Sequence, residues 1–393
     1  MYLSRKHYLE EIQSYIGKPL IKVITWQRRI GKTVFLEQFS QIFPSSDVLY
    51  LNKEDKAFDF LKNDDDLYAY LKGEIKKGKK YIFCDEVQMI THREAAINAL
   101  FATHKTSVDF YLSGSNSSML SSELSTILSG RYVQFQIFAF SFEEFCEYFK
   151  KEKNAESFND YLAKGGLPII YEIDNEQIIK DFTTSLVDTI IVKDLIPRYK
   201  IQNPTLLKEV FLFMVNNMGN LTNLSRILDY LDSHGIKSNY TTLAHYVEAL
   251  KSAYLIYEVP LYDLQGKRIF DKERKFYVSD HFFKTAFFSS FDTGLSKALE
   301  NIVYLAGLRH GYAIYVGKIK DKEVDFIFEK NGKKLYFQVC YLLADEGVIQ
   351  REFGNLEKIQ DNRPKYVVSM DQVDFWVVNG VKHIKIWDLE NVL

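Results

Sequence analysis

Residues 25–33 read Thr-Trp-Gln-Arg-Arg-Ile-Gly-Lys-Thr, and they join an apolar run at 20–25 to a segment with helical spacing at 33–42. A strand, a loop ending in Gly-Lys-Thr and a helix, in this order, form the context of a Walker A phosphate-binding loop. In such a loop the backbone N–H groups and the helix N-terminus surround the phosphates. The sequence therefore predicts a nucleotide site formed by Trp26, Gln27, Arg28, Arg29, Ile30, Gly31, Lys32, Thr33 and Val34.

The side chains of this loop have different expected roles. The Lys32 ammonium would neutralise the β and γ phosphates, and the Thr33 hydroxyl would bind Mg²⁺. Because the backbone lines a phosphate cradle, Arg28 and Arg29 are expected to face solvent or an adjoining domain. The predicted ligands are therefore ATP and Mg²⁺.

Trp26 stands where a Walker A pattern has its first glycine. A glycine is used where the chain turns without a Cβ or approaches a ligand closely, and an indole adds a large side chain at that point. Three interpretations remain open: a natural loop that bends differently, a plugged site without hydrolysis, or a substitution, since one base change converts a Gly codon to Trp. The fold is predicted in each case, and hydrolysis is left open.

A second pattern of a nucleotide site occurs at residues 81–86, Tyr-Ile-Phe-Cys-Asp-Glu. An apolar strand that ends in two acids is typical of a Walker B motif. Asp85 would hold Mg²⁺, directly or through water, and Glu86 would orient the attacking water, because phosphoryl transfer depends on positioning and charge neutralisation. Alone, the two acids are more simply explained as a helix N-cap and its neighbour. Together with the loop at 25–33, they predict a P-loop fold.

Polar residues after the next predicted strand extend this site. Ser113 is expected to sense the γ-phosphate, with Ser115 and Asn116 as substitutes, although a simple Ser/Asn-rich turn is equally consistent with the pattern. Arg131 would contact a phosphate in cis or from a neighbouring subunit, as an arginine finger, or would form a surface ion pair. The catalytic candidates of the whole site are Glu86, Lys32 and Arg131.

Composition excludes several classes of protein. The 393 residues suit two or three domains, and 47% hydrophobic with 26% charged residues is ordinary for globular chains. A net charge of −2 gives no global positive field that would attract nucleic acid. The three cysteines form neither a disulfide framework nor a zinc spacing. Without a signal peptide or a membrane-length apolar run, we expect a cytoplasmic protein that makes no membrane contact.

The order of strand-like and helix-like segments predicts an α/β protein of four parts. Residues 1–140 alternate like a parallel sheet with crossover helices, the P-loop core. Residues 141–200 are helical apart from a Gly-Gly-Leu-Pro turn at 165–168, and form a predicted lid or connector. Residues 201–263 read as three short helices and a hairpin, a winged helix-turn-helix. Residues 264–393 form a strand-rich α/β tail.

Further motifs occur in a recognisable order, at residues 27–33, 85–88, 113–115, 130–131, 140–145, 165–168, 300–304, 323–326 and 338–339. With them the chain resembles the prokaryotic AAA-superfamily ATPases that carry a C-terminal domain of unknown function with a nuclease-like fold. The resemblance covers essentially the whole chain. It implies ATP binding, a winged-helix middle and, usually, no assigned process. The loop of that family begins with glycine, so Trp26 departs from it.

A winged helix raises the hypothesis of DNA binding, with residues 240–251 as the recognition helix. This segment has Lys251 but also Glu248 and no arginine, so its attraction to phosphate is weak. Packing between the other parts of the chain is the simpler role. The basic residues that remain as backbone contacts are Lys237, Lys267, Arg268, Lys272 and Arg274.

The tail resembles a restriction-endonuclease-like metal site, which needs two acids and a lysine. Glu300 and Asp325 match the acids, but Gln338 stands where a further acid belongs and Cys340 where the lysine belongs. An amide and a thiol do not replace those charges. The resemblance therefore implies a nuclease-like scaffold without nuclease activity.

Three functions follow from these observations. The first is an ATP-binding protein, an Mg²⁺-dependent ATPase whose nucleotide state moves the lid and tail. The second is a nucleotide-insensitive adaptor for DNA or for a protein partner, with Trp26 closing the site. The third is an ATP-gated nuclease that depends on Asp325.

Overall fold

The computed structural model describes residues 5–114, 130–288, 294–373 and 377–393, without the side chains of Trp26, Asp271 and Lys272. The chain forms two compact units. Unit 1 comprises Met1–Phe138 and Ser252–Tyr254, and unit 2 comprises Ala139–Lys251 and Leu255–Leu393. The chain therefore passes from one unit to the other three times. The short segment Ser252–Tyr254, which begins at the end of a helix of unit 2, belongs to unit 1.

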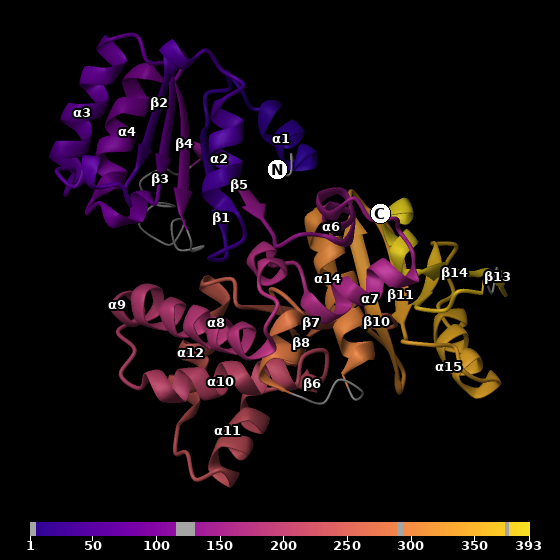
Figure 1. Cartoon of the computed structure of the whole chain (residues 1–393). Coiled ribbons are helices and arrows are strands. Elements are labelled where there is room, and N and C mark those ends of the chain that lie inside the picture. Colours follow the sequence, from indigo (N-terminus) through magenta and orange to yellow (C-terminus); the bar gives the residue numbers. More distant parts are fainter. Residues whose placement is uncertain (1–4, 115–129, 289–293, 374–376) are drawn as a thin grey trace. The chain divides into compact units, whose positions relative to one another are not determined.

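Unit 1 is built on a five-stranded sheet in the order β2-β3-β4-β1-β5 (Figure 1). All neighbouring strands are parallel. The strands are β1 (Ile21–Trp26), β2 (Val48–Asn52), β3 (Tyr81–Asp85), β4 (Asp109–Gly114) and β5 (Tyr132–Ile137). The predicted parallel sheet is confirmed, while β5 is an addition because its alternating residues had not been read as a strand. Since β4 lies between β1 and β3, the carboxyl ends of these three strands meet at one edge.

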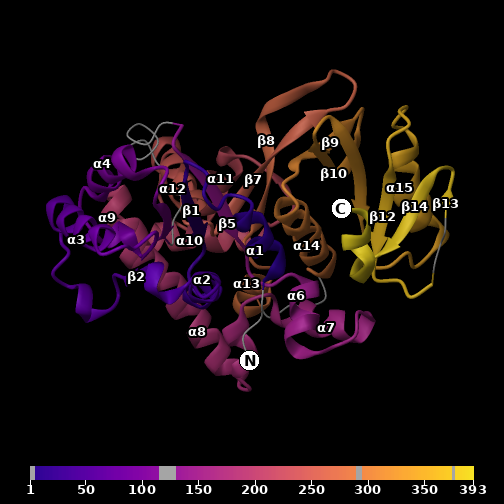
Figure 2. The ribbon, with the colours of Figure 1, turned by 90° about the horizontal axis from the view of Figure 1, so that it is seen from above.

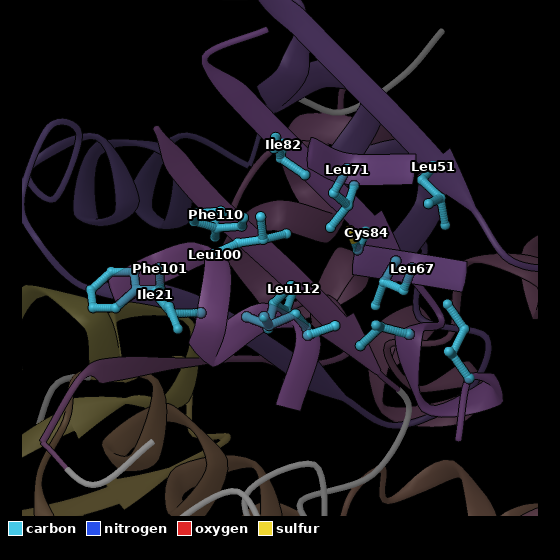
Figure 3. Packing of buried hydrophobic residues seen from close by; sticks show 14 of the residues in the cluster. Ile21, Leu51, Leu67, Leu71, Ile82, Cys84, Leu100, Phe101, Phe110 and Leu112 are labelled. Carbon is cyan, nitrogen blue, oxygen red and sulfur yellow. The ribbon is translucent and has the colours of Figure 1, made fainter. Parts of the chain in front are cut away.

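Helices cover both faces of this sheet. They are α1 (Lys6–Gln13), α2 (Lys32–Ser40), α3 (Asp64–Lys76) and α4 (Arg93–His104). Alternate residues of β3 face opposite sides, as a strand requires. Ile82 and Cys84 belong to the apolar cluster that α3 and α4 close (Figure 3). Phe83 packs against Phe39 of α2, and it stacks on Tyr111 with ring centroids 4.5 Å apart.

Helices occur from the start of unit 2 to its last part. They are α6 (Phe142–Phe149), α7 (Ala155–Lys164), α8 (Glu176–Thr189), α9 (Ile196–Tyr199), α10 (Pro204–Asn216), α11 (Leu224–Ser233), α12 (Tyr240–Ser252), α13 (Phe282–Phe287), α14 (Leu295–Arg309) and α15 (Glu346–Glu357). The predicted turn at 165–168 follows α7. There Gly165 has φ +73°, and a Cβ would lie 2.2 Å from an Asp280 carboxylate oxygen, so only glycine fits.

Unit 2 also contains a mixed nine-stranded sheet in the order β13-β14-β12-β11-β10-β9-β7-β8-β6 (Figure 2). Its strands are β6 (Leu221–Thr222), β7 (Ile256–Asp263), β8 (Arg268–Val278), β9 (Ala313–Ile319), β10 (Lys322–Lys330), β11 (Lys333–Val339), β12 (Lys365–Ser369), β13 (Val377–Val378) and β14 (Val381–Lys385). An apolar cluster of residues from the sheet and α15 includes Val324, Phe353 and Cys340. α14 contacts β8, β9, β10 and β11.

The segment predicted as a winged helix consists of α10, α11 and α12, followed by the hairpin of β7 and β8. β8 also pairs with the short β6, and β7 pairs in parallel with β9. The hairpin is therefore part of the same sheet as the tail. The boundary expected between residues 263 and 264 falls in the hairpin turn, and the winged-helix and nuclease-like assignments stay predictions.

The cysteines and the hydropathy of the helices can be described for both units. Cys84, Cys146 and Cys340 are free and buried. Within the described ranges, no helix combines the length and the hydropathy needed to cross a membrane.

Candidate functional site

The candidate site lies where β1 ends and α2 begins, at the carboxyl edge of the unit 1 sheet (Figure 1). Ligands of open parallel sheets bind at this edge, because the loops that leave the strands converge there. The loop at residues 27–31 follows β1, and Glu86 follows β3. Ser113 is in the last part of β4, between them.

The loop backbone turns through left-handed conformations. Arg29 has φ +69° and Gly31 has φ +89°. Among the described residues, no atom outside its neighbours lies within 4 Å of the position that a Cβ on Gly31 would take. The glycine is therefore needed for its backbone conformation and not for lack of space. The N-terminus of α2, where unpaired N–H groups attract anions, follows directly.

Lys32, the first residue of α2, extends toward the acids that end β3. Its Nζ lies 3.3 Å from Asp85 Oδ1 and is in direct ionic contact with Glu86 Oε1. The Asp85 side chain is fully buried, and that of Glu86 is 5% exposed. Burial lowers the pKa of Lys32, and the nearby Asp85 carboxylate offsets part of that effect. A phosphate at this place would thus meet a poorly hydrated ammonium.

Asp85 is held by two hydroxyls. Thr33 Oγ1 donates to Asp85 Oδ2 at 3.3 Å, and the Ser113 hydroxyl donates to Asp85 Oδ1. Ser113 Oγ also accepts from the Glu86 amide at 3.2 Å. A hydroxyl and a carboxylate in contact are the pair of oxygen ligands that Mg²⁺ takes in phosphate sites. Ser113 thus positions Asp85 in this structure.

Glu86 adopts a left-handed backbone conformation, φ +53°, which is uncommon for a residue with a side chain. Its carboxylate accepts a hydrogen bond from Gln88 Nε2 and also contacts Lys32. Strained backbone of this kind is often kept where a side chain must have one defined direction. Here it directs Glu86 toward the loop lysine.

Gln27 provides a test of whether a polar ligand fits the site. Its residue is only 4% exposed, yet Nε2 has no hydrogen-bond partner among the described residues. A buried amide without a partner costs free energy unless a ligand or water satisfies it. The Lys32 ammonium and the α2 N-terminus fit an anionic ligand such as a triphosphate, and Gln27 adds an unused donor in the same loop.

The remaining loop residues contribute less through their side chains. Ile30 is 1% exposed and packs inward. Arg29 is exposed and Arg28 is half-buried, in agreement with a cradle lined by backbone. Val34 is half-buried within α2. The Trp26 side chain, Ser115 and Asn116 lie outside the described residues.

Arg131 lies elsewhere in unit 1. It precedes β5, whose Tyr132 pairs with Ile21 at the start of β1, so the phosphate loop is about 17 Å further along the sheet. The exposed Arg131 guanidinium donates to Asn98 Oδ1 on α4. The structure therefore does not bring Arg131 to the loop of its own chain, and its role toward a neighbouring subunit stays a prediction.

Sequence reasoning missed a hydrogen-bonded group beneath the loop. Tyr254 OH donates to Thr25 Oγ1 at 2.9 Å, and Gln134 Nε2 donates to both hydroxyl oxygens. Thr25 is the second-last residue of β1, immediately before Trp26. No spacing in the sequence indicates this contact, because residues 25 and 254 are distant along the chain.

The predicted recognition helix α12 offers little free positive charge. Lys251 Nζ lies 2.7 Å from a Glu248 carboxylate oxygen and 2.5 Å from one of Glu258. Nε2 of His245 is 2.8 Å from the Tyr199 carbonyl oxygen. The exposed aromatic residue of this helix is Tyr240, at 60%. These pairings leave α12 less positive charge for a phosphate, and its role toward DNA stays a prediction.

The predicted residues of the tail are partly brought together in unit 2. Glu300 on α14 and Asp325 on β10 both contact Lys275 of β8. Gln338 Oε1 accepts from the Asp325 amide at 3.4 Å. Cys340 belongs instead to the apolar cluster that contains Phe353 of α15. Lys275 was not predicted as a site residue, because in the sequence it reads as a lysine that precedes the apolar residues of a strand.

The sequence matches two known domain families and is similar to two uncharacterized proteins. An AAA domain matches residues 18–146, and a domain of unknown function (DUF8612) matches residues 155–298. An uncharacterized protein of Haemophilus influenzae is 30% identical over 401 residues, which cover 98% of each chain. An uncharacterized protein of Methanocaldococcus jannaschii is 29% identical over 394 residues, 95% of this chain and 86% of that one.

Similar solved structures include a Walker-type ATPase of Pyrococcus abyssi, with 16% identity, a TM-score of 0.49 and coverage of 72% of this chain and 95% of that one. AMPPCP-bound DnaA from Aquifex aeolicus is 14% identical with a TM-score of 0.28, over 64% of this chain and 93% of that one. With 30% identity over 98% of both chains, this protein belongs to the family of the Haemophilus influenzae protein, and its residues 18–146 form an AAA domain of the P-loop type.

Proposed function

We propose that unit 1 binds ATP with Mg²⁺ and hydrolyses it, and that the nucleotide state controls movement of unit 2. The observation that supports this most is the meeting of four side chains at the end of the loop, where Lys32 contacts Asp85 and Glu86 and Thr33 donates to Asp85. An ammonium, a hydroxyl and two carboxylates are the groups that phosphoryl transfer requires.

Each of these side chains has a task in the proposed reaction. Lys32 leaves Glu86 and pairs with the β and γ phosphates, while the α2 N-terminus and the loop amides surround them. Bound Mg²⁺ supplies neutralisation of the phosphate charge, and Thr33 and Asp85 are the residues that would hold it. Glu86, released from Lys32, orients water for in-line attack. The ion pair between Lys32 and Glu86 thereby keeps the base inactive until nucleotide binds.

The proposed coupling to unit 2 is supported by the path of the chain. Ser252–Tyr254 belongs to unit 1 and begins at the last residue of α12. Tyr254 is hydrogen-bonded to Thr25, the residue before the start of the phosphate loop at Trp26. A shift of the loop when phosphate binds would therefore act on the segment at which α12 ends. We propose this segment as the mechanical connection.

The test is ATP binding and turnover measured side by side for the wild type, Trp26→Gly and Lys32→Ala. We expect ATP with Mg²⁺ to raise the melting temperature of the wild type, because a ligand that binds only the folded state stabilises it. We expect Lys32→Ala to lose this shift. If only Trp26→Gly binds ATP, the indole blocks the site and the adaptor function is favoured. If neither the wild type nor Trp26→Gly binds ATP, the proposal is rejected.

A further inference from the structure

A second cluster of lysine and carboxylates lies within unit 2, far from the phosphate loop along the chain. Lys275 Nζ of β8 lies 2.5 Å from Glu323 Oε1, 3.3 Å from Glu300 Oε2 and 3.4 Å from Asp325 Oδ1. The carboxylates come from β10 and α14. One ammonium is thus shared by three carboxylates from two elements of the unit.

The register of β10 explains how Asp325 reaches this cluster. Val324 pairs with Gly317 of β9 and Ile327 pairs with Tyr315, so β10 has one extra residue between these pairs. Such a bulge changes the direction of the side chains within it. Asp325 lies in the bulge, and its other oxygen accepts from the Val339 amide at 2.9 Å.

The cluster is enclosed. The side chains of Lys275, Glu300 and Asp325 are 1%, 3% and 7% exposed. Tyr277 OH donates to Glu300 Oε2 at 3.1 Å. Gly219 packs so closely that a Cβ there would lie 3.0 Å from the same oxygen. These contacts leave the Lys275 ammonium little room to move.

The charge of Lys275 is secured by its neighbours. Burial alone lowers the pKa of Lys275, but Glu300, Asp325 and Glu323 together raise it above its ordinary value. Burial in turn raises the pKa of Glu300, and the Lys275 ammonium opposes that rise. The three carboxylates around Lys275 therefore favour its charged form.

These residues do not fit the metal that a nuclease-like tail implies. Mg²⁺ would need the carboxylate oxygens that the Lys275 ammonium already contacts, and two cations in one enclosed site repel each other strongly. Gln338 adds a neutral amide, and Cys340 lies in an apolar cluster. Within the described ranges, no group of three or more His, Cys, Asp and Glu side chains is arranged to hold a metal ion.

We infer that Lys275 is an internal cation that takes the place of a divalent metal between Glu300, Glu323 and Asp325. The wild-type tail accordingly binds no divalent cation at these carboxylates and does not cut DNA. Replacing Lys275 by a neutral side chain, as in Lys275→Met, leaves three carboxylates without the cation that they share, and their mutual repulsion favours the uptake of another cation. That variant gains a site for a divalent cation with oxygen ligands.

The experiment is equilibrium dialysis of nucleotide-free full-length protein against about 1 mM Mn²⁺, a concentration sufficient for weak oxygen-ligand sites. We expect Lys275→Met to bind one more Mn²⁺ than the wild type, and Lys275→Met/Asp325→Asn to lose that gain. Any Mn²⁺ held near Asp85 contributes equally to all variants. A folded Lys275→Met protein without additional Mn²⁺ would overturn the inference.

The wild type provides a test that does not require Lys275→Met to fold. The wild type and Glu323→Gln, whose substituted side chain is 35% exposed, are expected to bind the same amount of Mn²⁺. Wild-type binding that Glu323→Gln lacks, or Mg²⁺-dependent cutting of DNA that Asp325→Ala lacks, shows that a metal enters the cluster. Either result contradicts the role assigned to Lys275.

Discussion

Both units place a lysine among buried carboxylates, but the two lysines are held differently. Lys32 begins a helix after a loop with left-handed residues, and its side chain is 11% exposed. Lys275 lies within a strand that has neighbours on both sides, and its side chain is 1% exposed. We expect a side chain at a helix N-terminus to be able to change partners, and a side chain enclosed on a strand that is paired on both sides to keep them.

The pKa shifts of the two lysines have opposite directions. For Lys32, burial outweighs the attraction of Asp85 and lowers the pKa. For Lys275, three carboxylates outweigh burial and raise it. Lys32 contacts two carboxylates at the start of a helix, whereas Lys275 contacts three and is more deeply buried. The same residue types therefore make an exchangeable site in unit 1 and a closed one in unit 2.

The largest expected effect concerns the carboxylate that Lys32 contacts in unit 1. Glu86→Gln is expected to lower ATP turnover by about 10²–10⁴-fold, because an amide does not take part in activating water. ATP binding should persist, since Lys32 loses a competing carboxylate. Turnover and the ATP-dependent rise in melting temperature measure the two effects separately. Glu323→Gln, the same change in the unit 2 cluster, is the matched control and should leave turnover unchanged.

The next effect concerns stability. Lys275→Met is expected to lower the free energy of unfolding of unit 2 by about 3–5 kcal/mol without added metal, because it leaves buried carboxylates without their cation. Lys32→Met should change the stability of unit 1 by less, because Lys32 contacts two carboxylates where Lys275 contacts three, and its side chain is 11% exposed. Urea unfolding, followed by probes in each unit, measures both. Equal losses would remove the distinction between the clusters.

A smaller effect is expected from the hydroxyl that holds Asp85. Ser113→Ala removes a hydrogen bond to the carboxylate and one from the Glu86 amide. A lost hydrogen bond of this kind costs about 1–3 kcal/mol. We therefore expect weaker ATP binding in the presence of Mg²⁺ by about tenfold, with a smaller change when EDTA removes the metal. An effect that is the same with and without Mg²⁺ would mean that Ser113 acts on the nucleotide and not through Asp85.

The unit 1 site could largely be predicted from sequence because its groups come from short motifs in a fold with a fixed strand order. Gly31, Lys32 and Thr33 are consecutive, and Asp85 and Glu86 end an apolar strand. The strand β5 and the contact of Tyr254 with Thr25 were not predicted, since each depends on how distant segments pair. The role of Arg131 depends on which end of β5 it occupies, and only the parallel register shows that.

The unit 2 cluster could be predicted only in part. Glu300 and Asp325 were named through a resemblance, but the partner that determines their chemistry is Lys275. This lysine lies on the hairpin of β7 and β8, which the boundary expected from the sequence divides between two domains. Its position follows from the pairing of β7 with β9 and from the bulge in β10. A bulge is a property of paired strands and has no separate signal in one sequence.

The smallest effect is expected from Lys297, which together with Lys275 contacts Glu300. Lys297 Nζ lies 2.8 Å from Glu300 Oε1, but the Lys297 side chain is 32% exposed. Solvent screens such a pair, so Lys297→Met should lower the stability of unit 2 by at most about 1 kcal/mol. Urea unfolding beside Lys275→Met is the measurement. A loss from Lys297→Met as large as that from Lys275→Met would show that the positive charge is shared between the two lysines. A small loss means that the enclosed Lys275 alone compensates the carboxylates, because only its ammonium contacts all three of them.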